Sequence, residues 1–264
     1  AVPAVPRDSI AGSVSRTAVI HDPVTRRFAV KLRVKFSKHG VLRFIGHLDV
    51  MRYFQKAIRR AGIDIAYSAG FSPHQVMSFA APLGVGLESN GEYMDIEVNS
   101  LTSASEFVDT LNAQMADGIR ILEVRLLLDN AGNAMASVAA ARYTITFREG
   151  CRPCFLTGSV VDDFYSQESI MVTKKTKKSE STFDMKPYIY ACSYDDKNDR
   201  LDLTVDASSA GNIKPALVVS ALFDYSHQAL DESGLMITRE ETYTNTGTAK
   251  EVRLEPLGSV GSDY

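Results

Sequence analysis

The sequence contains no tryptophan and only three cysteines, Cys151, Cys154 and Cys192, among 264 residues. Three thiols cannot all pair with one another and are too few for a disulfide framework, so we expect a protein of the reducing cytoplasm. Long hydrophobic runs are also missing, since the longest, such as residues 216–223, fall well short of the ~20 residues that cross a bilayer. The start of the sequence carries no secretion signal. We therefore predict no membrane association.

Signatures of several enzyme classes are absent as well. The sequence has no Walker-type phosphate loop, and Gly84-Val-Gly86 lacks the third glycine and the following helix of a dinucleotide site. Cys151 and Cys154 are spaced so that both thiolates can reach one metal ion, but a closed zinc site needs four ligands. We therefore predict no cofactor and keep Cys151 and Cys154 as the alternative metal ligands.

Positive charge is concentrated in one segment. The whole chain has a net charge of -3, yet residues 31–62 contain nine basic side chains and one acidic side chain, Asp49. This segment therefore carries +8 and the rest of the chain -11. Segregation of this size favours a polyanionic partner, and we expect a continuous, solvent-facing strip of cations. The alternative is a solvated helix face that has no partner.

Hydrophobic periodicity predicts the secondary structure of the first half. Residues 29–36 alternate between apolar and basic side chains, as in a half-buried strand. Residues 48–61 change to helical spacing, with apolar residues on one side and arginine and lysine on the other, and Gly62 is placed to end this helix. A second helix is predicted after Ser103 or Ser105. Further strands are predicted over residues 63–67, 76–80, 93–98 and 119–127.

The order strand, helix, strand, strand, helix, strand is typical of the ferredoxin-like (βαββαβ) arrangement. A similar order recurs in the second half, with one strand too many, and Tyr143 to Phe147 lies 111 positions after Leu32 to Phe36. We predict an α+β fold of two tandem ferredoxin-like modules with antiparallel sheets. The expected boundaries are an extended arm or leader over residues 1–29, modules over 30–130 and 140–245, and a loose tail over 246–264.

Seven short motifs follow one another along the chain. They are Leu42-Arg-Phe-Ile-Gly-His-Leu-Asp49, Ala57-Ile-Arg-Arg-Ala-Gly62, Ala66-Tyr-Ser-Ala-Gly-Phe-Ser-Pro-His74, Pro82-Leu-Gly-Val-Gly86, Gly91-Glu-Tyr-Met-Asp95, Asp184-Met-Lys-Pro187 and Gly211-Asn-Ile-Lys-Pro215. In these motifs the sequence resembles the bacterial radical-SAM-associated (radical-SAM-linked) family of unknown function. The resemblance implies a cytoplasmic partner of a radical S-adenosylmethionine enzyme in RNA modification or processing. The chain itself lacks the CxxxCxxC cluster that such an enzyme needs for its iron–sulfur centre.

Together, the charge pattern and the resemblance predict a non-catalytic RNA-binding accessory or adaptor, with a tRNA or rRNA as ligand and a radical S-adenosylmethionine enzyme as partner. Cations would contact phosphates, and an exposed aromatic side chain beside them would stack on an unpaired base. A protein-only docking module is an alternative. The predicted RNA contacts are Lys38, Arg43, Arg52, Lys56, Arg59, Arg60, Phe71, His74, Lys174, Lys175, Lys177 and Lys178.

A metal-independent endoribonuclease is the other alternative. His39, His47 and His74 fall in motif-rich loops of the first module. A histidine can take the proton of a 2′-hydroxyl, and a nearby cation can stabilise the phosphorane that forms. His47 and Asp49 equally suit the start of a helix, where Asp49 would favour the positive helix end.

Overall fold

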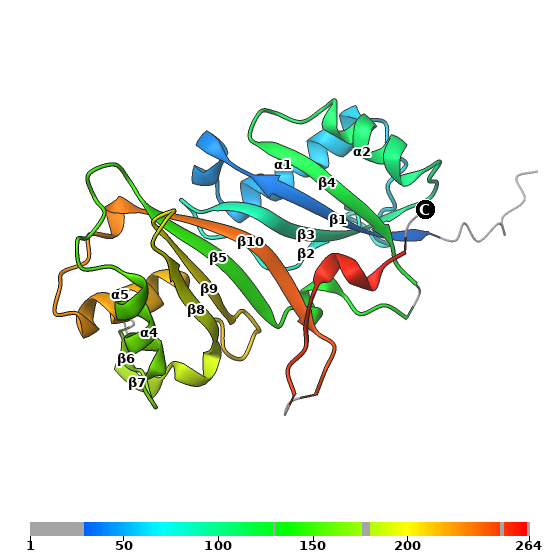
Figure 1. Ribbon diagram of the computed structural model, residues 1–264. Helices are drawn as coiled ribbons and strands as arrows, with labels where there is room; N and C mark the ends of the chain where they lie inside the picture. The colour runs from blue at the N-terminus through cyan, green and yellow to red at the C-terminus, as the bar shows by residue number, and fades with distance from the viewer. Residues whose placement is uncertain (1–28, 129, 176–179, 249–250, 263–264) are drawn as a thin grey trace, which may run out of the picture.

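The computed structural model describes residues 29–128, 130–175, 180–248 and 251–262. These residues form a mixed α+β fold with a large, mostly antiparallel sheet and five α-helices (Figure 1). No helix among them has the length and apolar character needed to span a bilayer. The predicted arm over residues 1–29 lies, apart from Ala29, outside the described residues.

The first half of the sheet is built around β1 (Val30–Lys38). This strand pairs antiparallel with β3 (Glu88–Val98) on one side and with β4 (Ile119–Leu126) on the other. The short strand β2 (Met77–Phe79) pairs with the opposite edge of β3. The prediction of one buried face for β1 is confirmed, because its apolar side chains pack under α1 (His47–Arg60) and α2 (Ala104–Asn112).

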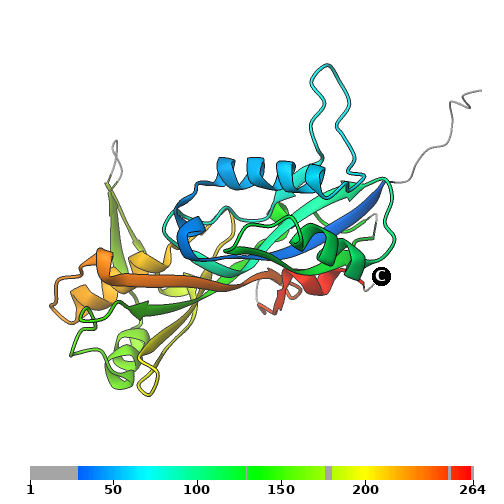
Figure 2. The same ribbon diagram turned by 90° about the horizontal axis from the view of Figure 1, so that it is seen from above.

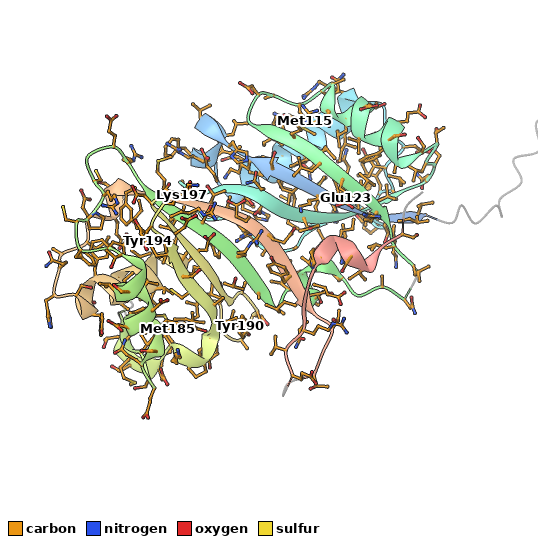
Figure 3. The ribbon with its side chains drawn as sticks, in the orientation of Figure 1. Met115, Glu123, Met185, Tyr190, Tyr194 and Lys197 are labelled. Atoms are coloured by element: carbon orange, nitrogen blue, oxygen red, sulfur yellow. The ribbon has the colours of Figure 1, made fainter. Side chains whose placement is uncertain are left out.

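The second half repeats this strand order, with β10 (Leu235–Asn245), β5 (Ala140–Phe147), β9 (Arg200–Asp206) and β8 (Ile189–Asp195) as neighbours. Its core lies under α4 (Gly158–Ser166) and α5 (Pro215–Tyr225) and includes both Met185 and Tyr194 of β8 (Figure 3). The one strand too many that the sequence predicted in this half is β6 (Met171–Lys175). It does not join the large sheet but pairs with β7 (Glu180–Asp184) in a separate two-stranded sheet (Figure 2).

One short parallel contact joins the two halves into a single sheet. Glu88 and Ser89 of β3 pair with Thr238 and Arg239 of β10. The antiparallel sheets predicted for the two halves are therefore corrected to one nine-stranded, mostly antiparallel sheet that runs through both halves (Figure 1). Sequence periodicity identifies strands but does not show that strands from two repeats meet at an edge.

The C-terminal segment, which we expected to be loose, returns to the sheet. Strand β11 (Leu254–Pro256) pairs with β10, and Ser262 forms a bridge with β4. The intervening 3-10 helix η4 (Leu257–Val260) buries Leu257 against Tyr93 and the short helix α3 (Ala134–Ser137). This segment therefore covers the face of the first half that the larger helices leave open.

Candidate nucleic-acid interface

The outer face of α1 is open to solvent. It carries four exposed cations, Arg52, Lys56, Arg59 and Arg60. They share one side of the helix because residues three and four positions apart are neighbours on a helix surface. Arg52 Nη1 donates to Asp49 Oδ1 at 3.3 Å, and Arg60 Nη2 donates to the Gln114 carbonyl at 2.8 Å. In the described part of the chain, Lys56 and Arg59 have no ion-pair partner. We call these four residues the α1 basic face.

The cations before α1 do not extend this face. Lys38 is only 2% exposed, and its Nζ donates to the carbonyls of Ile45 at 3.0 Å and Arg43 at 3.4 Å. Burial lowers the pKa of Lys38. The prediction of Lys38 as an RNA contact is therefore wrong, because its charge is already surrounded by protein.

Two basic side chains in the middle of β1 are neutralised by carboxylates. Arg33 forms an ion pair with Asp95 at 2.8 Å, and Lys35 Nζ lies 2.6 Å from Glu241 Oε2. These side chains leave the sheet on the face opposite to α1, because Leu32 and the other alternate residues of β1 pack under the helices. The continuous strip of cations is therefore wrong, and the exposed charge is concentrated on α1.

A loop beyond the C-terminal end of α1 carries the predicted aromatic contact. Phe71 is fully exposed at its tip, and His74 Nδ1 lies 2.8 Å from Ser68 Oγ. Gln75 Nε2 donates to the Gln55 carbonyl of α1 at 3.2 Å, which ties the loop to the helix. Figure 2 shows the loop projecting beside α1. The loop is thus attached to α1, but His74 lines a cavity with Lys31 and Asp95, and Asp95 pairs with Arg33 on the face of the sheet opposite to α1.

The three histidines do not form one catalytic site. His39 is engaged at both ring nitrogens, by Glu88 at 3.2 Å and Asn90 at 2.8 Å. It directly follows β1, whereas His74 lines a cavity with Lys31 near the other end of that strand. Lys31 lies eight residues before His39, which is about 26 Å at ~3.3 Å per residue. His47 packs edge-on against the Phe79 ring.

The lysines predicted to clamp RNA from the second half are placed only in part. Lys174 and Lys175 are the last two residues of β6. This strand projects on the same side of the molecule as α1 (Figure 2). Lys177 and Lys178 lie outside the described residues. Their role therefore stays a prediction.

Among the described residues, no group of three metal-ligating side chains comes together. Cys151 and Cys154 are exposed free thiols. Cys192, which is buried under α4, has a thiol pKa that burial raises to about 12, so it is neutral at physiological pH.

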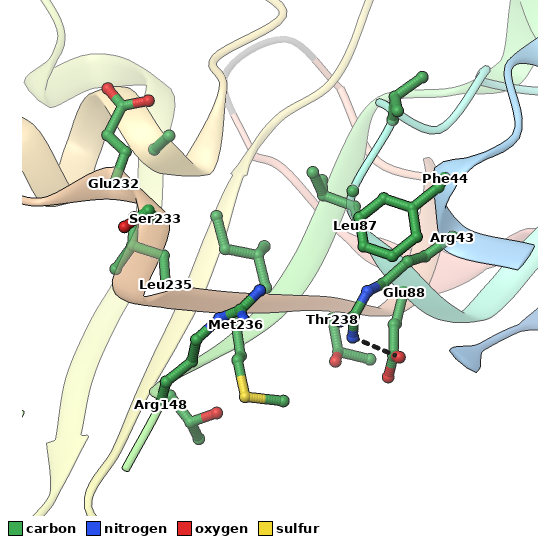
Figure 4. Close-up of a pocket in the computed structure, with 15 residues that line it drawn as sticks. Arg43, Phe44, Leu87, Glu88, Arg148, Glu232, Ser233, Leu235, Met236 and Thr238 are labelled. Carbon is green, nitrogen blue, oxygen red and sulfur yellow. Dashed lines mark hydrogen bonds and ion pairs between the residues drawn. The ribbon is translucent and has the colours of Figure 1, made fainter. Parts of the chain in front are cut away.

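A cleft of about 310 Å³ lies where the two halves meet, and we call it the junction cleft (Figure 4). Arg43 and Phe44, at the end of the 3-10 helix η1 (Gly40–Phe44), form one wall with Leu87. Arg148 and Met236 come from the second half. Of these lining residues, the sequence predicted only Arg43 as an RNA contact, because the opposite wall is remote in sequence.

Glu88 organises the wall of the junction cleft that belongs to the first half. It accepts hydrogen bonds from the Gly40 amide and Arg43 Nη1, both at 3.0 Å, and contacts His39. Burial favours its neutral form, but these hydrogen bonds outweigh that effect and lower the pKa of Glu88. The carboxylate therefore stays ionised and holds Arg43 in place, so Arg43 is only partly free to contact a phosphate.

Comparison with known families matches residues 31–215 to a family described as "uncharacterized protein conserved in bacteria" (DUF2344). No curated protein matches the chain. The matched span includes α1, its neighbouring loop and the wall of the junction cleft formed by η1. The family description names neither a reaction nor a partner.

Proposed function

This chain belongs to the DUF2344 family of proteins conserved in bacteria, and we propose that it binds RNA through the α1 basic face without cutting it. The observation that carries this proposal is the set of four exposed cations on one side of a 14-residue helix. From Arg52 to Arg60 they extend over about 12 Å at ~1.5 Å per residue, enough to reach several phosphates of one backbone.

We further propose that the protein acts as an accessory to a radical S-adenosylmethionine enzyme, which would carry out the RNA chemistry. This step depends on the motif resemblance. The repeated strand order of the two halves supports the related proposal that both are ferredoxin-like modules.

Reversing charge on α1 tests RNA binding. The triple variant Arg52→Glu, Lys56→Glu, Arg59→Glu is expected to lose at least about tenfold in affinity for a stem–loop RNA at moderate salt. The slope of log K against log salt should fall by about three, one for each lost phosphate contact. Fluorescence anisotropy over a salt series measures both quantities.

The matched control reverses three exposed cations that do not lie on α1, Arg142, Lys197 and Arg253. The control has the same change in net charge and should retain most of the RNA affinity. If the α1 variant binds as tightly as the unaltered protein, the proposal is wrong. A chain that binds no RNA but retains a protein partner after nuclease treatment would instead be a docking module.

The absence of cleavage is a separate prediction. Purified protein incubated with total RNA in EDTA should produce no discrete fragments, because His39, His47 and His74 do not converge. Gel electrophoresis of end-labelled RNA is the measurement. Fragments that disappear in a His74→Ala or His47→Ala variant would establish the endoribonuclease instead.

A further inference from the structure

We propose that the junction cleft takes one unpaired nucleotide of the RNA that the α1 basic face retains, an inference that rests on the proposed function. Its volume of about 310 Å³ lies at the lower end of the ~300–1,000 Å³ typical of small-ligand sites. That space suits a single nucleotide and is far too small for a double helix.

The walls of the junction cleft provide surfaces on which a flat base can stack. Phe44 is 57% exposed, and the Arg43 guanidinium lies 4.9 Å from the centroid of its ring. Leu87 and Met236 add apolar surface from the two halves (Figure 4). Stacking on an aromatic ring beside an arginine is a common way to hold an unpaired base.

The charges of the junction cleft favour a monophosphate over a more highly charged anion. Two arginines, Arg43 and Arg148, face two carboxylates, Glu88 and Glu232, so the lining has no net charge. Arg43 already pairs with Glu88. Arg148 is exposed and has no ion-pair partner among the described residues, so it is the group available to one phosphate.

The polar groups that remain suit the edge of a base. Hydroxyls of Thr146, Ser233 and Thr238 line the cleft, and each can donate or accept a hydrogen bond. A base inside an A-form duplex is stacked and paired, so it cannot enter the cleft. Only a looped-out or single-stranded nucleotide can occupy it.

The wall of the junction cleft formed by η1 directly precedes α1 in the chain. Phe44 ends η1, and α1 begins three residues later at His47. A strand whose backbone follows Arg52 and Lys56 therefore approaches the cleft from the N-terminal end of α1. The base inserted there would add selectivity for unpaired RNA to binding that is otherwise governed by charge.

The test uses a stem–loop RNA with 2-aminopurine in its loop and a blunt duplex of the stem alone. The unaltered protein is expected to bind the stem–loop more tightly and to quench the 2-aminopurine fluorescence. Phe44→Ala should weaken stem–loop binding by about tenfold, leave duplex binding unchanged and abolish the quenching. Phe44→Trp should preserve both signals, since it retains an aromatic face.

Leu48→Ala is the matched control, because Leu48 is 60% exposed on the next turn but does not line the junction cleft. It should behave as the unaltered protein. Equal losses in Leu48→Ala and Phe44→Ala would indicate a general apolar surface suited to a protein partner, and would overturn the inference. So would a Phe44→Ala variant that binds both RNAs normally, although the proposed function would then stand.

Failure of the proposed function has a different signature. If the α1 triple variant binds both RNAs normally, the cleft is tested alone with 2-aminopurine riboside 5′-monophosphate. Quenching that disappears in both Phe44→Ala and Arg148→Ala supports a nucleotide site in the cleft. Absence of quenching in the unaltered protein overturns it.

Discussion

Replacing Gly91 with alanine is expected to destabilise the fold by about 3 kcal/mol or more, and valine at this position should prevent folding. Gly91 lies in β3 against the backbone of β10. An added Cβ would lie 2.5 Å from Glu241 Cα and 2.8 Å from the Glu240 carbonyl oxygen. Neither atom belongs to a flexible side chain, so β3 and β10 would have to separate.

Separation at Gly91 would also break the hydrogen bonds that join the halves. Thr242 Oγ1 donates to the Gly91 carbonyl at 2.7 Å, and Ser89 Oγ lies 3.2 Å from the Arg239 carbonyl. Urea unfolding followed by circular dichroism measures the loss. Gly84→Ala is the control, since its Cβ would meet only the Leu87 side chain, at 3.6 and 4.0 Å. A Gly91→Ala protein within about 0.5 kcal/mol of the original would contradict the argument.

The first half of the fold could be predicted well from local pattern. Alternation identifies β1, helical spacing identifies α1, and these signals need only neighbouring residues. The same reasoning assigned the basic face of β1 to solvent, which is wrong. Its carboxylate partners are remote: Glu241 is 206 residues from Lys35 and Asp95 is 62 residues from Arg33. A charge count along the chain does not detect such pairs.

One part of the candidate site could be predicted from local sequence pattern and the other could not. The α1 basic face could be predicted, because all its members lie on one helix. The junction cleft could not, since Phe44 meets Arg148 and Met236 only after β3 and β10 pair. The role of Gly91 in the motif Gly91-Glu-Tyr-Met-Asp95 was equally hidden, because the atoms that exclude a Cβ belong to β10.

Arg33→Met is expected to destabilise the protein by about 3–5 kcal/mol, because it leaves a partly buried carboxylate without its partner. The Arg33 side chain is fully buried and makes two hydrogen bonds to Asp95, at 2.8 and 3.0 Å. It also donates to the carbonyls of Gly132 at 2.9 Å and Leu257 at 3.1 Å. One guanidinium therefore fixes both segments that cover this face of the sheet.

A double-mutant cycle with Asp95→Asn separates the contribution of the ion pair from that of the hydrogen bonds that Arg33 donates to the Gly132 and Leu257 carbonyls. Asparagine keeps an oxygen that can accept from the Ala134 amide, which donates to Asp95 Oδ2 at 2.7 Å. The double variant should therefore be more stable than the sum of the single losses predicts, because neither charge is left alone. Urea unfolding of all four proteins provides the coupling free energy.

The control for burial is Arg200→Met, which breaks the ion pair with Asp202 on β9, where both side chains are partly exposed. Its cost should stay below about 1 kcal/mol, as for other surface pairs. Arg33→Met should also make the chain near Gly132 and Leu257 accessible to proteases before the helices unfold, since their carbonyls lose a common donor. An Arg33→Met protein as stable and protease-resistant as Arg200→Met would show that packing of Leu257 and Tyr93 alone holds these segments on the sheet.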